Sequence, residues 1–242
     1  MNADLLDSEP VLHQHSGWLL PLGVFVITAA LSAGVLAYYL LPRPAFFFHE
    51  QALPSAVTDR VSLTVHDINF SIPANYLEFK KARAGGEQKE VALFALMPAM
   101  TGFTPADADR FRSNDPDSDL IYILVREDAL GLGEAERFRR IYLSYVENPA
   151  GERGPYGLTQ YGFRGNSGYG DQDLFVGKTS SGPVVLRCVR ASDSVPSPSC
   201  LRDQTLSTGV SISYRFKRAH LDRWREIGAD VDRLIKRFEV AK

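Results

Sequence analysis

Cysteine is scarce in this chain: its 242 residues include only Cys188 and Cys200. The pair does not form a C-x-x-C motif, so a redox-active dithiol is not expected. The two residues bracket a polar, proline-containing segment, which predicts a disulfide that closes a short loop. Such a crosslink would stabilise the fold by about 3 kcal/mol and persists in oxidising compartments. The alternative is two buried thiols that never meet.

Motifs of catalysis are also lacking. The sequence contains no G-x-S-x-G elbow and no Gly-Lys-Ser/Thr phosphate-binding motif. His66 and His220 are the only histidines of the predicted domain, and each becomes a base only if the fold places it beside a nucleophile. Residues 115–119 begin like a calcium loop, but Leu120 and Arg126 occupy the positions of its glycine and bidentate glutamate. We therefore predict no catalytic, cofactor or metal site and no enzyme.

An excess of positive charge is missing as well. The formal net charge is −2, and residues 1–17 contain three acids and no lysine or arginine. The other 225 residues carry 27 basic and 26 acidic side chains and are nearly neutral. Because nucleic-acid binding needs a basic face, nucleic acid is not an expected partner.

One long hydrophobic run stands out, at residues 18–41, where 24 residues carry no charge. As a helix this run would be roughly 36 Å long, enough to cross a hydrocarbon core of ~30 Å with some tilt. Trp18, Tyr38 and Tyr39 lie at its ends, where aromatic rings favour the membrane interface. A signal peptide would have a basic start and a shorter apolar core. The run therefore predicts an uncleaved membrane anchor.

Two features around this run predict contacts with other membrane proteins. Small residues recur along the helix and would allow close packing in lipid, although any apolar helix contains some. These residues are Ala29, Ala30, Ala33, Gly34 and Ala37. After the helix, Phe46, Phe47 and Phe48 are expected to lie along the interface or against another subunit.

The topology signals disagree. Arg43 and Arg60 follow the span, which weakly favours a cytoplasmic domain under the positive-inside rule. The cysteine pair favours an oxidising space. We give more weight to the cysteines and predict a single-pass protein of the inner membrane. The predicted parts are a cytoplasmic tail (1–17), a transmembrane helix (18–41), a juxtamembrane linker (42–60) and a periplasmic domain (61–242).

Hydrophobic periodicity predicts mainly strands in this domain, with two helices. Alternating apolar residues indicate a hairpin at 61–72, and residues 120–125 (LIYILV) are predicted to be a central, buried strand. Steps of three and four predict helices at 134–146 and 218–240. Further strands are predicted at 91–97, 156–163, 173–176, 183–189 and 210–216.

Together these patterns predict an α+β domain. Its antiparallel sheet of six to eight strands, including a meander, would be covered by the long C-terminal amphipathic helix. An all-β sandwich is the alternative fold. For function, the sequence favours a non-catalytic accessory, structural or assembly subunit of an inner-membrane complex, with the bilayer and other integral membrane subunits as partners. A periplasmic ligand-binding or sensing module and a tethered hydrolase are the alternatives, and the sequence identifies no ligand.

Overall fold

The computed structural model describes residues 17–40, 52–128, 131–180 and 182–240. The chain divides into two units, residues 1–49 and 50–242. The first contains α1 (Leu19–Leu40), and its segment Leu19–Tyr38, with a mean hydropathy of 2.2, is long and apolar enough to cross a membrane. The predicted small-residue stripe lies on this helix. Phe46, Phe47 and Phe48 and the side chain of Tyr39 lie outside the described residues.

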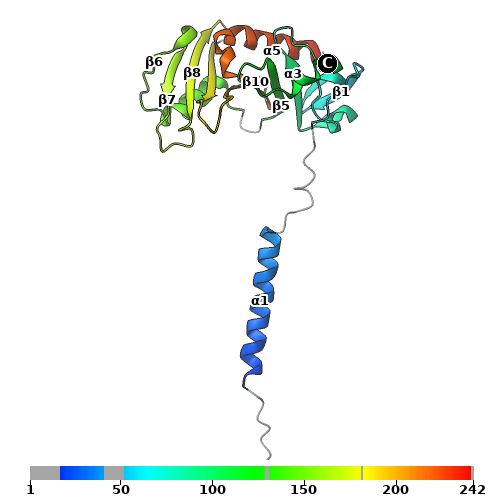
Figure 1. The fold of residues 1–242 in the computed structure, drawn as a ribbon, viewed down its shortest axis with the longest axis vertical. Helices are drawn as coiled ribbons and strands as arrows, with labels where there is room; N and C mark the ends of the chain where they lie inside the picture. The colour runs from blue at the N-terminus through cyan, green and yellow to red at the C-terminus, as the bar shows by residue number, and fades with distance from the viewer. Residues whose placement is uncertain (1–16, 41–51, 129–130, 181, 241–242) are drawn as a thin grey trace, which may run out of the picture. The chain divides into compact units, whose positions relative to one another are not determined.

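The second unit is an α+β domain built on an eight-stranded antiparallel sheet. Its strands lie in the order β4-β5-β11-β10-β9-β8-β7-β6, so the meander β6 to β11 joins the hairpin of β4 and β5 through β11 (Figure 1). The strands are β4 (Glu90–Leu96), β5 (Leu120–Glu127), β6 (Glu152–Arg153), β7 (Thr159–Gly162), β8 (Gln172–Thr179), β9 (Gly182–Val189), β10 (Ser199–Ser207) and β11 (Val210–Lys217).

A smaller sheet contains the predicted hairpin. Strands β1 (Arg60–Val65) and β2 (Ile68–Pro73) pair antiparallel, and β3 (Gly86–Gln88) pairs parallel with β1. Short 3-10 helices connect the elements: η1 (Ala74–Tyr76), η2 (Lys81–Ala84), η3 (Pro105–Asp107), η4 (Tyr142–Ser144), η5 (Pro155–Gly157) and η6 (Arg218–Arg223).

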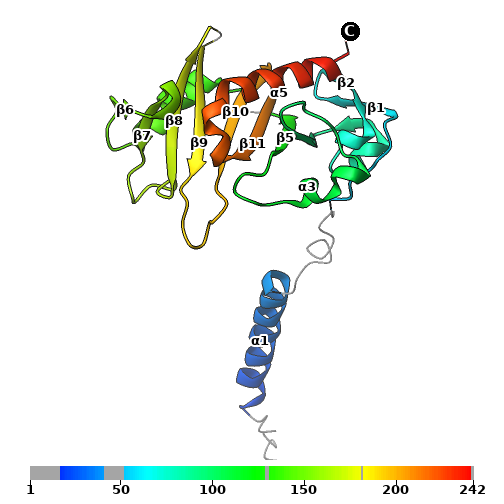
Figure 2. The ribbon, with the colours of Figure 1, turned by 45° about the horizontal axis from the view of Figure 1, so that its top comes forward.

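Helix α5 (Trp224–Phe238) covers one face of the large sheet, as the sequence predicts. In Figure 2 it crosses β9, β10 and β11 and reaches toward β2. It is shorter than predicted, because residues 218–223 form η6 before it. Its buried stripe removes apolar surface from water, worth about 1.5–3 kcal/mol for each large side chain. The stripe consists of Trp224, Ile227, Gly228, Val231, Leu234, Ile235 and Phe238.

The opposite face of the sheet is covered only toward its ends. At one end, α4 (Glu134–Arg140) and η4 pack on β7, β8 and β9 through a cluster that includes Tyr142, Leu174 and Val185. At the other end, α3 (Ala108–Arg112) places Phe111 on Phe94 of β4, with ring centroids 4.9 Å apart. In the described part of the chain, no helix packs over the middle of this face at β5 and β11.

The N-terminus of α4 is fixed between two strands by Glu134. Its carboxylate accepts hydrogen bonds from the Val185 backbone N–H and from Nε and Nη2 of Arg202, the latter two at 3.1 and 3.0 Å. Arg202 Nη1 also donates to the Tyr214 hydroxyl at 3.2 Å. Burial raises the pKa of Tyr214 to about 12. This buried network joins α4 to the sheet, and it stabilises the fold only while all its members stay paired.

The structure pairs Cys188 of β9 with Cys200 of β10 in a buried disulfide. The two residues lie directly opposite each other in the antiparallel ladder. The disulfide thus closes the loop between β9 and β10 at the point where the two strands meet.

Three sequence expectations differ from the structure in detail. The predicted helix at 134–146 ends at Arg140, because the chain turns there into η4 and buries Tyr142. Strand β10 was not predicted, since its sequence SCLRDQTLS has few apolar residues. The run at 120–125 is a strand, but β5 is second from one edge of the sheet and leaves Tyr122 and Leu124 partly exposed.

Candidate protein-binding groove

The uncovered middle of the sheet presents a mixed apolar and charged surface. Tyr122 of β5 lies opposite Arg215 of β11, and Arg215 lies opposite Leu201 of β10. In the next row, Leu124 of β5 lies opposite Ser213 of β11. Side chains of one row share a face because strand residues alternate. The two rows therefore leave an aromatic ring and two leucines partly exposed beside an exposed cation, where a packed sheet would bury apolar residues.

Three hollows join along this surface. The central one, of about 420 Å³, is lined by Tyr122, Leu124, Leu201 and Arg215 among others. A second, of about 220 Å³, shares Tyr122 and Arg215 with it. A third, of about 670 Å³, shares Ala92 and Leu124 with the central hollow. Because neighbouring hollows share lining residues, we treat them as one surface and call it the sheet groove.

The two ends of the sheet groove differ in charge. The third hollow is lined by charges of both signs, from Lys81, Lys89, Glu87 and Glu90. The second hollow has two cations, Arg215 and Lys217, and no acidic lining residue. Its other polar lining residues are Ser113, Asn114, Ser118, Ser197 and Ser199. One end of the groove is therefore cationic and rich in hydroxyl groups.

The cations at this end are held by neutral groups. Lys217 Nζ donates to Asn114 Oδ1 and Ser197 Oγ, each at 2.6 Å, and the Arg215 guanidinium lies 5.2 Å from the centre of the Tyr122 ring. Within the described part of the chain, neither cation forms an ion pair with a carboxylate. The pKa of Lys217 is lowered by burial and by the nearby charge of Arg215.

The central hollow also perturbs its titratable groups. Burial raises the pKa of the Glu78 carboxyl, although Arg215 opposes this effect. Burial likewise raises the pKa of Tyr122, to which the charge of Glu78 adds. Charges in the groove are therefore partly removed from water, where electrostatic interactions with a partner become stronger.

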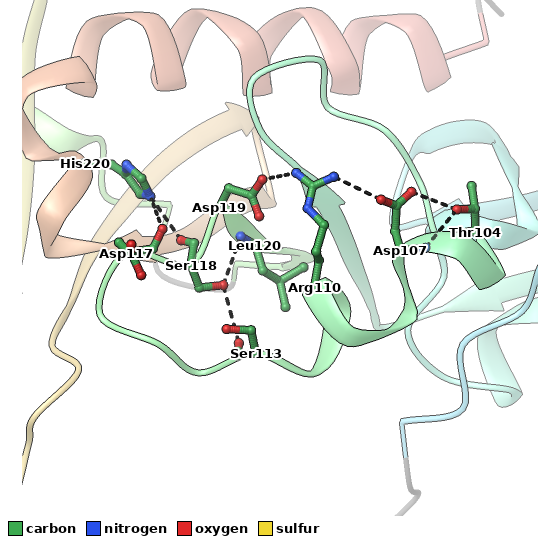
Figure 3. Close-up of polar contacts among 9 residues, drawn as sticks. All are labelled: Thr104, Asp107, Arg110, Ser113, Asp117, Ser118, Asp119, Leu120 and His220. Carbon is green, nitrogen blue, oxygen red and sulfur yellow. Dashed lines mark hydrogen bonds and ion pairs between the residues drawn. The ribbon is translucent and has the colours of Figure 1, made fainter.

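A pinned loop forms the wall at the cationic end (Figure 3). Arg110 bridges Asp107 and Asp119, with its Nη1 at 3.0 Å from Asp107 Oδ1. His220 Nε2 donates to the backbone carbonyls of Asp117 and Ser118, each at 3.1 Å. These bonds fix the loop that contributes Ser113, Asn114 and Ser118 to the groove, so this wall is formed before any ligand arrives.

Neither histidine is arranged as a catalytic base. His220 binds two carbonyl oxygens, and exposed His66 occupies the turn between β1 and β2, beside Gly209. In the described residues, the ring of neither is hydrogen-bonded to a hydroxyl or carboxylate group. No group of three or more metal-ligating side chains in these residues is placed to hold a metal ion.

The predicted site residues that the structure describes are not among those that line this groove. Cys188 and Cys200 are buried in the core that includes α5, and the alanines of α1 lie in the other unit. Sequence reasoning did not identify the groove residues. One signal was available: the run LIYILV is apolar on both faces of the strand, but one face leaves Tyr122 and Leu124 partly exposed.

These features define the chain as an α+β protein with a helix-covered antiparallel sheet, a disulfide and a candidate transmembrane helix. Comparison with protein-family models and with curated protein sequences finds no match. Among solved structures, the fold is similar to that of Smlt3025, an immunity protein of the Stenotrophomonas maltophilia type IV secretion system. The TM-score is 0.54 at 18% identity, over 76% of this chain and 94% of that one. At this identity the similarity concerns the fold.

Proposed function

We propose that this chain is a membrane-anchored, non-catalytic protein whose periplasmic domain binds another protein. The sheet groove carries this proposal, because it leaves Tyr122, Leu124 and Leu201 partly exposed between the two covered ends of one sheet face. Apolar patches bordered by polar groups on soluble domains mark interaction sites. The length of α1 supports the anchor, and the disulfide supports an oxidising compartment.

The fold similarity favours one form of this function, that of an immunity protein. Smlt3025 has that role, and the similarity covers nearly all of its chain. On this proposal, the partner is a toxic protein that reaches the periplasm, and the domain protects its own cell by binding that protein. Such a role needs a recognition surface and no reacting groups, in keeping with the positions of His66 and His220.

A second candidate is an accessory or assembly subunit of an inner-membrane complex. The stripe of small residues on α1 favours it, because Ala29, Ala33 and Gly34 are exposed on the helix and would permit close packing with another helix in lipid. The two candidates differ in where the partner binds. An immunity protein uses the domain, whereas a complex subunit uses α1 as well.

A growth-competition experiment separates the two. Cells that lack the chain are grown in contact with otherwise identical parent cells, with and without the full-length chain supplied again. If the chain is an immunity protein, the deletion cells should be killed and the full-length chain should restore their survival. Survival together with loss of a defined membrane complex on a native gel would support the second candidate. Survival with every membrane complex unchanged would contradict both.

A further inference from the structure

We infer that the sheet groove binds an acidic segment of the partner protein. A carboxylate of that segment pairs with Arg215 and Lys217 at the cationic end. A neighbouring apolar side chain packs on Tyr122, Leu124 and Leu201 in the central hollow. This inference rests on the proposed function and adds the chemistry of the partner to it.

The charge at the cationic end indicates a carboxylate. Arg215 and Lys217 line the same hollow, and the hollow has no acidic lining residue. Glu78 in the central hollow and Asp115 near Lys217 each offset part of this charge, but neither carboxylate forms an ion pair with Arg215 or Lys217 in the described structure. Two adjacent like charges repel each other, and an incoming anion reduces that repulsion. Arginine also binds carboxylates with two parallel hydrogen bonds, which fixes the direction of approach.

The apolar part of the groove indicates a protein segment and not a free anion. Tyr122 and Arg215 belong both to the cationic hollow of about 220 Å³ and to the central hollow of about 420 Å³. A small inorganic anion would leave the central hollow filled with water. A peptide segment fills both, and aromatic and arginine side chains are the residues that contribute most at protein interfaces.

The groove is also prepared for binding. The loop at its cationic wall is fixed by Arg110 and His220, as Figure 3 shows. On the other side, Asp203 accepts hydrogen bonds from Ser213 Oγ and from Arg187 Nη2, the latter at 3.3 Å. A surface that is ordered before binding loses less conformational entropy when the partner arrives.

The test is photo-crosslinking of the full-length chain in its native membranes, with benzoylphenylalanine placed at one position at a time. Leu201 and Lys89 are groove positions. Exposed Arg139 on α4 and Lys178 on β8 lie outside it. We expect a discrete adduct from the groove positions, with a partner peptide that mass spectrometry shows to contain Asp or Glu.

Charge reversal then tests the acidic contact. Arg215→Glu should lower the adduct yield at Leu201 by roughly tenfold or more, because the introduced carboxylate repels the acidic side chain of the partner. Arg215→Lys should restore most of the yield. The matched control Arg139→Glu should change it less than about twofold. Because Arg215 and Arg139 are both exposed, each variant should keep the melting temperature of the parent chain.

The outcomes separate this inference from the proposed function. Adducts only at Arg139 or Lys178 would show that the partner binds outside the sheet groove, but they would still support a protein-binding function. If the adduct at Leu201 persists in Arg215→Glu, the groove is the binding site but the bound segment is not held by an acidic side chain. The absence of adducts at all four positions would overturn both the inference and the function.

Discussion

Asp173 on β8 shows how single residues tie this fold together. Its buried carboxylate accepts hydrogen bonds from Arg190 Nε at 2.8 Å and from Arg218 Nη2 at 2.6 Å. Burial alone would raise the pKa of this carboxyl, but the bonds from the two arginines outweigh burial, so the pKa lies below its ordinary value. Arg218 begins η6, so one side chain connects the meander to the segment that leads into α5.

Replacing Asp173 with asparagine should lower the free energy of unfolding at pH 7 by about 2 kcal/mol, since the arginines lose a charged acceptor. Because the folded pKa is lowered, the carboxylate stabilises the fold above the unfolded pKa of about 3.9, and this contribution declines as pH falls through the folded pKa. Urea unfolding at pH 7 and at about pH 3 should therefore show a smaller difference between parent and variant at the lower pH.

The control for this prediction is Asp171→Asn. Asp171 is exposed, and its backbone carbonyl accepts a hydrogen bond from the Arg190 N–H. Its replacement should change the free energy of unfolding by less than about 0.5 kcal/mol. Equal effects of the two substitutions would show that the ion pairs of Asp173 do not stabilise the fold.

Among the elements, α5 depends on a close approach to the sheet. Trp224 at its start lies directly over Gly177 of β8, where an added Cβ would stand 2.3 Å from the indole ring. The indole Nε1 also donates to the Tyr156 carbonyl at 3.3 Å. The ring therefore has little freedom to move, and the strand needs glycine at this position.

Replacing Gly177 with alanine should destabilise the domain by about 1–3 kcal/mol, because the extra methyl group overpacks the core. The melting temperature of the full-length chain in detergent should fall by ~2–4 °C for each kcal/mol. Gly168→Ala is the matched control, since nothing lies within 4 Å of a Cβ there, and its melting temperature should equal that of the parent. An unchanged melting temperature for Gly177→Ala would mean that α5 does not lie so close to β8.

The sequence predicts an element well when its hydrophobic periodicity is strong. The stripe of α5 and the alternation of β1 and β2 each bury one complete side, so their periodicity is clear. Strand β10 is buried little along its length and lies between β9 and β11, so its polar sequence shows no such pattern. The sheet groove combines β4, β5, β10, β11 and the loop before β5, which only tertiary structure brings together.

For the whole molecule, α1 and the disulfide are two independent indications of the topology in the membrane. Helix α1 has the length and composition of a membrane span, and Cys188 and Cys200 are bonded in the domain. A disulfide between the only two cysteines of the chain forms and persists when the domain lies in an oxidising space. If the domain lay in the cytoplasm, cellular reductants would keep both thiols reduced.

The oxidation state of the pair in living cells therefore tests the topology. Cells are quenched with acid, the protein is unfolded in detergent, and a maleimide-linked polymer is added with or without prior reduction. Because both cysteines are fully buried in the fold, unfolding is needed before the reagent can reach them. We expect no gel shift without reductant and a shift of two polymer units after it. A double shift without reduction would place the domain in the cytoplasm and remove the basis for a periplasmic partner. A Cys188→Ser, Cys200→Ser chain should never shift, and it should also lose about 3 kcal/mol of stability because the loop constraint on the unfolded chain is removed.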